Sequence, residues 1–228
     1  LEKVAGVSPD LRVRFSTSNP KDMGDDVLHA IAKHENICKY IHLPVQSGHN
    51  DVLQRMNRGY SREWYLERIA SIRRHMPECA ISTDIIAGFC GETEEEHHAT
   101  VSIMTEVGFD MAYMFKYSER PRTLAERKFE DDIAEEIKTR RLQEIIDVQM
   151  KNAALRTASH VGKTQKVLIE GFSKRSSDFY QGRNSQNVVA IFPVSADFGP
   201  GDYVEVKMTG ATSVTLTGEA VSVVSKRS

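Results

Sequence analysis

The hydrophobic period of the chain changes near Gly162, and this change constrains the fold more than any other feature of the sequence. Before Gly162, short apolar runs alternate with stretches whose apolar residues recur every three to four positions. After it, the period falls to about two and the helical signals end. Alternating strands and helices favour a parallel sheet with crossover helices, whereas short strands punctuated by glycine favour a small barrel. The sequence therefore predicts two domains of different class, 1–158 and 159–228.

The first domain is expected to be α/β. Its clearest helix start is the capping box at Thr93 and Glu96, and Gly108 stands where a glycine often ends a helix. Four apolar runs are typical of strands: Leu11–Thr17, Lys39–Val45, Ala80–Gly88 and Asp110–Tyr117. Four β/α units are too few to close a barrel, for which about eight strands are usual. They form either a small open sheet or part of a larger barrel, and in a partial barrel the first strand is an open edge that further polypeptide or another chain should cover.

A long helix and a group of short strands make up the rest of the chain. Apolar residues at helical spacing continue from about 133 to 158, the length of a helix that commonly links two domains. Five strands are expected after it, at Val167–Glu170, Val188–Phe192, Tyr203–Met208, Ser213–Thr217 and Ala220–Val224. Five short strands in so short a segment are typical of an OB-like barrel.

The composition excludes some classes and weakly favours others. The net charge of the 228 residues is −2, which is no general nucleic-acid signature, but residues 159–228 carry eight Lys or Arg against six Asp or Glu. No apolar run approaches the roughly 18 residues of a membrane span. Cys38, Cys79 and Cys90 stand singly and match no metal or disulfide motif, which indicates a reduced, cytoplasmic protein. The first residues include neither an initiator Met nor an apolar leader, so we expect a portion of a longer protein.

Polar residues at or after the predicted strands are the candidates for chemistry, because the loops at the carboxyl ends of barrel strands converge on one site. A carboxylate such as Asp84 is costly inside a barrel unless it is paired, so it is either functional or in an ion pair with Arg14 or Lys116. His42 is either functional or simply hydrogen-bonded in place, and Gln46 either binds a polar ligand or belongs to a turn. The full candidate set in this domain is Ser16, Ser18, His42, Gln46, Ser82, Asp84 and Arg120.

In the second domain, basic residues lie close in sequence to aromatic ones. Lys174, Arg175 and Arg183 fall in predicted turns near Phe172 and Phe179. Cations for phosphates beside aromatic rings for bases are what recognition of single-stranded or loop RNA requires. The alternative is a solvated hairpin turn whose aromatic residues pack against the barrel.

Several ordered strings resemble the second half of the radical S-adenosylmethionine (SAM) methylthiotransferases. The strings are Arg14–Pro20 (RFSTSNP), His42–Gly48 (HLPVQSG), Met56–Tyr60 (MNRGY), Ser82–Phe89 (STDIIAGF), Gly91–Thr93 (GET) and Tyr117–Pro121 (YSERP). MNRGY and YSERP favour the branch of that family that acts on tRNA. Farther on, Val167–Gly171, Gly182–Asn184 and Gly201–Val204 resemble the RNA-binding TRAM domain. The sequence differs from the family at Cys90, where proline is usual, and at Arg122, where glycine is usual.

The resemblance implies a fold and a set of cofactors. The fold is a partial TIM-like (β/α) barrel of the radical SAM type, with about four β/α units present, followed by a small OB-like TRAM barrel. The cofactors are SAM and two [4Fe–4S] clusters. Because the family's cluster-binding cysteines have no counterpart here, the three cysteines are assigned no cluster, and the chain is expected to contain no metal ligand or catalytic residue and to be inactive alone.

The resemblance also implies a reaction and partners. The reaction is addition of a methylthio group to carbon 2 of an isopentenyl-modified adenosine beside the anticodon, with the tRNA anticodon stem-loop and a reductant protein as partners. Ser16, Ser18, Gln46, Ser82 and Asp84 would line the SAM cavity, whereas His42, Arg120, Lys174, Arg175 and Arg183 would contact the substrate RNA. The alternatives are a related methylthiotransferase that modifies another adenosine or a ribosomal protein, and a non-catalytic RNA-binding module.

Overall fold

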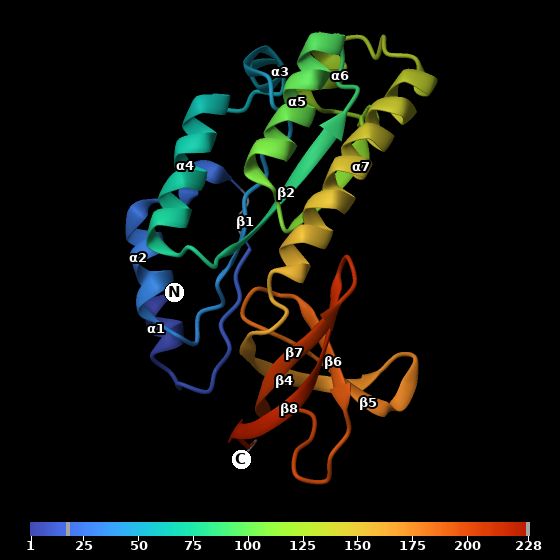
Figure 1. The fold of residues 1–228 in the computed structure, drawn as a ribbon. Coiled ribbons are helices and arrows are strands. Elements are labelled where there is room, and N and C mark those ends of the chain that lie inside the picture. The colour runs from blue at the N-terminus through green and yellow to red at the C-terminus, as the bar shows by residue number, and fades with distance from the viewer. Residues whose placement is uncertain (17–18, 227–228) are drawn as a thin grey trace.

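The structure is a computed structural model that describes residues 1–16 and 19–226. A mixed α/β region is followed by a β-barrel, and one long helix, α7, leads from the first to the second (Figure 1). The helices of the described chain are α1 (Glu2–Ala5), the 3-10 helix η1 (Pro20–Asp22), α2 (Asp25–Lys33), α3 (Asn50–Arg55), α4 (Arg62–His75), α5 (Glu94–Val107), α6 (Leu124–Lys128) and α7 (Glu135–Ala158). None of these described helices combines the length and apolarity needed to cross a membrane.

The sheet of the first region is parallel, in the order β1-β2-β3. Its strands are β1 (Tyr40–His42), β2 (Ala80–Ala87) and β3 (Met111–Lys116). Helices α4, α5 and α7 pack on one face, where Ile81 and Ile85 of β2 are buried among their apolar side chains. Met111, Tyr113 and Phe115 alternate with buried residues of β3 and are exposed on the other face. The sheet therefore has one covered face and one open face.

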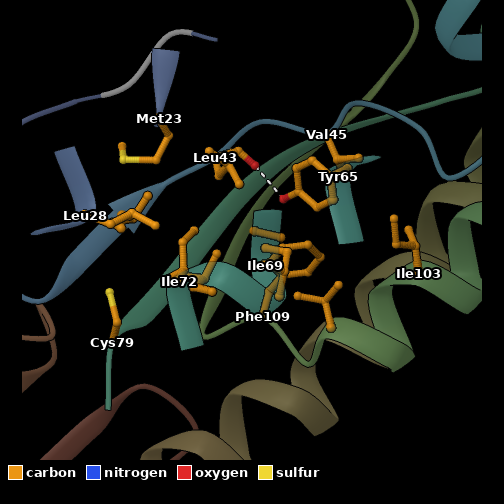
Figure 2. Packing of buried hydrophobic residues seen from close by; sticks show 14 of the residues in the cluster. Met23, Leu28, Leu43, Val45, Tyr65, Ile69, Ile72, Cys79, Ile103 and Phe109 are labelled. Carbon is orange, nitrogen blue, oxygen red and sulfur yellow. Dashed lines mark hydrogen bonds between the residues drawn. The ribbon is translucent and has the colours of Figure 1, made fainter. Parts of the chain in front are cut away.

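A continuous apolar core holds the helices on the covered face. Figure 2 shows Leu43 beside β1, Tyr65 and Ile72 of α4, and Phe109 after α5 in this core, and all four are fully buried. The Tyr65 hydroxyl donates a hydrogen bond to the Leu43 carbonyl at 2.7 Å, which satisfies the polar end of a buried ring. Burial of each such side chain contributes roughly 1.5–3 kcal/mol, so these contacts fix the plane of the sheet.

The helix signals read from the sequence are confirmed at α5 and α7. The Thr93 hydroxyl accepts from the Glu96 amide while the Glu96 carboxylate accepts from the Thr93 amide, and Gly108 ends α5 with φ of 60°. The predicted long helix is observed as Glu135–Ala158.

The predicted first strand, Leu11–Thr17, is wrong over its described part. Val13 forms a single parallel bridge with Ile37, and no strand follows. The flanking Arg12 and Arg14 instead direct their guanidinium groups to backbone carbonyls of the second region. Thr17 lies outside the described residues. The described residues of this region therefore form three strands rather than four, and the edges of their sheet are β1 and β3 rather than the predicted one.

The second strand is shorter than the predicted Lys39–Val45. The Leu43 amide still donates to the Ser82 carbonyl, but Pro44 has no amide hydrogen and Val45 donates to the Thr83 hydroxyl instead. Pairing resumes where the Gln46 amide donates to the Asp84 carbonyl. The proline thus ends the regular ladder and leaves an irregular segment along β2.

The predicted small barrel is confirmed, with two corrections in its strands. It closes in the order β4-β5-β6-β8-β7. The strands are β4 (Thr164–Ser173), β5 (Ser176–Arg183), β6 (Val189–Pro193), β7 (Tyr203–Ala211) and β8 (Thr215–Ser225). Strand β5 was missed because its polar sequence was interpreted as turns. The last two predicted strands form the single strand β8. Gly218 does not end a strand; it lets β8 pack closely against β7, because a Cβ there would meet the Lys207 carbonyl oxygen at 2.5 Å.

Candidate functional site

A polar cluster lies on the open face of the sheet. The register pairs His42 of β1 with Ser82 of β2, and Asp84 lies two residues farther along the same face. His42 Nδ1 is 2.9 Å from Ser82 Oγ, and His42 Nε2 is 3.4 Å from Asp84 Oδ1. The sheet thus brings three predicted site residues into one cluster.

The partner of Asp84 differs from both ion pairs considered from the sequence. Lys116 pairs with Glu135 of α7, and Arg14 donates to the Asn184 carbonyl in the second region. Asp84 therefore retains one carboxylate oxygen near His42 and lines an open cavity, where a ligand can reach it. Both ring nitrogens of His42 have polar neighbours, an arrangement also compatible with the alternative that His42 is simply hydrogen-bonded in place.

The cavity has a volume of about 710 Å³ and begins at the carboxyl end of β2. This volume is within the range of small-molecule and cofactor pockets. Gln46, Asp84 and Arg120, the last a predicted RNA contact, form part of its wall. The remaining wall consists of Arg55, Met56, Asn57, Arg58, Ile86, Phe89, Phe115, Lys116, Tyr117, Ser118, Thr123, Leu124 and Ala125. The cavity is thus partly charged and partly aromatic.

Backbone strain is concentrated around this cavity. Gln46, Asn57 and Arg122 adopt positive φ angles of 72°, 56° and 68°. The left-handed conformation costs a non-glycine residue roughly 1–2 kcal/mol, and such residues cluster at binding sites. At Gln46 the conformation is fixed by two backbone hydrogen bonds, one to the Asp84 carbonyl and one from the Ile86 amide. The Gln46 side chain is thereby held in the wall next to Asp84.

The other predicted residues of this site are placed less centrally. Ser82 and His42 are both absent from the cavity wall; Ser82 is fully buried and contacts His42, which in turn lies beside Asp84, so Ser82 supports the site rather than lining it. Ser16 is exposed and does not line the cavity, and Ser18 lies outside the described residues. Sequence reasoning missed Asn57, Arg58 and the aromatic wall. The MNRGY string carries a signal for the first two, because Asn57 and Arg58 belong to it.

The predicted basic turn of the second region lies at the tip of the hairpin of β4 and β5. Lys174 and Arg175 form the two-residue connection between β4 and β5, and both are exposed. Phe172 and Phe179 are 54% and 40% exposed, so they do not serve only to fill the barrel. Arg183 lies at the far end of β5 and pairs with Glu170 at 3.3 Å. The structure therefore does not place Arg183 at this tip.

The cysteines of the chain do not form a cluster site. Cys38, Cys79 and Cys90 are each buried and free, and burial raises the pKa of Cys79 to about 12, which disfavours the thiolate that metal binding needs. Among the described residues, only His49, Asp51 and Glu96 approach one another closely enough to share a metal ion. Glu96 already accepts two hydrogen bonds from Arg55. The residues present do not fit an iron–sulfur cluster.

Comparisons with known proteins agree with this architecture. Residues 1–103 match the radical SAM superfamily, and residues 158–221 match the TRAM domain. The tRNA-2-methylthio-N(6)-dimethylallyladenosine synthase of Azobacteroides pseudotrichonymphae is 52% identical over 96% of this chain and 49% of its own length. The synthase of the same name from Parabacteroides distasonis is 54% identical over 97% of this chain and 48% of its own length. The chain thus spans about half the length of the curated relatives it matches.

A solved structure supports the fold alone. Coproporphyrinogen III oxidase from Escherichia coli, a radical SAM enzyme, superposes with a TM-score of 0.50 at 16% identity, over 74% of this chain and 45% of that one. The superposition agrees with the α/β fold, and the two family matches place a radical SAM region before a β-rich TRAM region. The chain therefore carries a radical SAM region followed by a TRAM domain, and its relatives are methylthiotransferases that modify tRNA.

Proposed function

We propose that the chain is part of a methylthiotransferase that adds a methylthio group to carbon 2 of an isopentenyl-modified adenosine near the tRNA anticodon. The observation that carries the proposal is the 710 Å³ cavity on the open face of a radical SAM sheet, with Gln46 and Asp84 side by side in its wall. The names of relatives at 52–54% identity supply the reaction and the nucleic acid.

The wall of the cavity suits SAM, which when bound would supply, together with iron–sulfur clusters, the radical chemistry of the reaction. A carboxylate at Asp84 complements the ammonium and sulfonium charges of that molecule, and the Gln46 amide can both donate and accept. Phe115 offers an aromatic face, being 55% exposed on the same side of the sheet as Asp84. These residues bind and orient the cofactor in this proposal.

The clusters themselves would be held by other parts of the complete protein, since the cysteines described here do not fit them. The proposed division of labour makes this chain inactive alone. The open face with Met111, Tyr113 and Phe115 is where further polypeptide would cover the sheet in the complete protein. An electron-donating protein is required to reduce the cluster that cleaves SAM.

The TRAM barrel would hold the anticodon stem-loop. Lys174 and Arg175 present two cations at the tip of the β4–β5 hairpin, and Phe172 and Phe179 are exposed rings of the same hairpin. Phosphate contacts from the cations and stacking on the rings are the two elements of sequence-tolerant binding to unpaired RNA. Arg183 is assigned a weaker role because Glu170 neutralises it.

Expression of the complete protein in cells that lack their own synthase tests the proposal. Mass spectrometry of digested tRNA should then detect the 2-methylthio derivative of the isopentenyl-modified adenosine, and Asp84→Asn should abolish it. Arg140→Met on the exposed side of α7 is a control that should leave the modification intact. If the protein binds tRNA but the tRNA stays unmodified, the chain belongs to a non-catalytic RNA-binding module instead. Methylthiolation of another adenosine or of a ribosomal protein would refute the proposed substrate.

A further inference from the structure

An apolar patch forms part of the wall of the 710 Å³ cavity. It consists of Met56, Phe89, Tyr117, Leu124 and Ala125. Phe89 lies just beyond the carboxyl end of β2, and Tyr117 directly follows β3, where its amide donates to the Ala87 carbonyl at 2.8 Å. Met56 ends α3, and the last two residues belong to α6, which lies at the same end of the molecule (Figure 1). Two strand ends and two helices thus contribute to one apolar surface.

Four members of the apolar patch are also held together by packing. Phe89 is 4% exposed and belongs to a small buried cluster that is separate from the main core. Met56, Tyr117 and Ala125 pack against that cluster. The rings of Phe89 and Tyr117 have their centroids 4.9 Å apart and are inclined at 73° to each other. The patch is therefore a supported surface whose shape is fixed by the fold.

The described residues leave the apolar patch only partly covered. Leu124 is its most exposed member, at 46%, whereas Met56 and Tyr117 are half-buried. Lys138 Nζ lies over the Tyr117 ring, 5.5 Å from its centroid, so one face of that ring is already occupied. The accessible part of the patch is therefore chiefly aliphatic, which suits a hydrocarbon group better than the stacking of a base on an aromatic face.

The components of the proposed reaction differ in polarity. SAM carries charges on its methionine part, and RNA carries a phosphate at every nucleotide. The isopentenyl group of the substrate adenosine is purely hydrocarbon. The apolar patch contains neither a carboxylate nor a cation, so it complements the isopentenyl group, whereas Asp84 and Gln46 in the same wall complement SAM.

We propose that the apolar patch binds the isopentenyl group and thereby makes the protein select isopentenyl-modified adenosine over unmodified adenosine, an inference that rests on the function proposed above. Because Asp84 lies within β2 and Phe89 beyond its end, the cofactor and the isopentenyl group occupy different parts of one cavity. Each CH₂ removed from water favours binding by roughly 4-fold. Partial burial of the group should therefore favour the modified RNA by roughly 10- to 100-fold.

Two substitutions reduce the apolar patch and leave Asp84 and Gln46 in place. Leu124→Ala removes the most exposed side chain of the patch, and a substitution on the surface of α6 should not disturb folding. Met56→Ala removes a second aliphatic side chain, at the end of α3. Leu155→Ala is the matched control, because Leu155 is 73% exposed on α7 and does not line the cavity.

The readout is the affinity of the complete protein for two RNA stem-loops that differ only in the isopentenyl group of one adenosine. The parent protein and Leu155→Ala should bind the modified stem-loop roughly 10- to 100-fold more tightly. Leu124→Ala and Met56→Ala should each reduce that ratio by roughly 3- to 10-fold, by weakening the binding of the modified stem-loop alone. Equal affinity of the parent protein for both stem-loops, or an unchanged ratio in both variants, overturns the proposal.

A second measurement separates this inference from the function proposed above. SAM affinity should be the same in the parent protein, Leu124→Ala and Met56→Ala. Weaker SAM binding with an unchanged RNA ratio would assign the apolar patch to the cofactor and overturn the inference, while the proposed function stands. Loss of the RNA preference in both variants supports the inference even if the complete protein leaves tRNA without a methylthio group, and in that case the proposed reaction alone is wrong.

Discussion

His42 Nε2 lies 3.4 Å from Asp84 Oδ1, on the one face of the sheet that helices do not cover. An imidazole and a carboxylate at this distance share a hydrogen bond only when a proton lies between them. The pair remains part-exposed, with 17% and 29% of the two side chains accessible, and Asp84 lines the cavity, where it can meet a ligand. A polar pair kept on an otherwise apolar face favours binding over packing as its role.

Removal of the two cations at the β4–β5 tip should reduce the salt dependence of tRNA binding. In Lys174→Ala/Arg175→Ala, the loss of two phosphate contacts should lower the slope of log affinity against log salt by roughly 1.4–1.8. Titration of tRNA at several salt concentrations measures the slope. Lys151→Ala, on the exposed side of α7, should leave it unchanged. An unaltered slope in the double variant would place the RNA elsewhere.

Replacement of Arg122 by glycine should stabilise the protein. Arg122 is exposed and has φ of 68°, so its side chain gains little and its backbone is strained. Arg122→Gly relieves that strain, and after the entropic cost of glycine the free energy of unfolding should rise by roughly 0.5–1 kcal/mol. Arg122→Ala is the control, since it removes the side chain and keeps the strain. Denaturant unfolding that ranks glycine at or below alanine would contradict this explanation.

The buried ion pair that joins α7 to the loop before α5 should be sensitive to removal of one partner. Arg141 Nη1 lies 3.0 Å from Glu92 Oε2, and both residues are at most 3% exposed. Arg141→Met leaves a buried carboxylate whose pKa burial already raises, so the free energy of unfolding should fall by roughly 3–5 kcal/mol. Arg140→Met removes two neighbouring surface pairs, with Glu94 and Glu144, and should cost less than about 1 kcal/mol. Equal losses in calorimetry would contradict the assignment.

Glu94 should make the stability of the protein depend on pH in acid. Hydrogen bonds from Arg141 and Arg140 lower the pKa of this carboxyl from 4.5 to about 2. A carboxyl whose pKa is lower in the folded state contributes stability above its unfolded pKa, and loses it as pH falls from 4.5 towards 2. Glu94→Gln should therefore flatten the pH dependence of unfolding in that interval. The adjacent exposed Glu95→Gln should not, and identical curves for both variants would contradict the mechanism.

Local signals in the sequence predicted the elements whose cause is local. The capping box at Thr93 and the left-handed Gly108 fix α5 with neighbours a few residues away, and both were found where expected. The prediction of a strand around Val13 is wrong because the conformation there depends on distant residues: Arg12 and Arg14 donate to the carbonyls of Arg183 and Asn184. Strand β5 failed for a related reason, since a barrel stabilises polar strands by closure and not by their own apolar pattern.

The site was predicted in outline and not in its contacts. Strand-end reasoning found Gln46, His42 and Asp84, because parallel strands bring such residues to one edge. It could not supply the hydrogen bonds of Ser82, which donates to the Tyr40 hydroxyl and lies 2.9 Å from His42 Nδ1. It also could not show whether Arg183 is free to contact RNA or is engaged within the protein; in the fold Arg183 forms an ion pair with Glu170.

Equilibrium binding of SAM to the complete protein and to its Asp84→Asn variant tests the central claim most directly. Asparagine keeps the shape of the side chain and removes its charge, so the affinity should fall by roughly 10-fold or more while Asp147→Asn on the exposed side of α7 binds normally. Equal affinity of the parent protein and Asp84→Asn would contradict the assignment of this cavity to the cofactor.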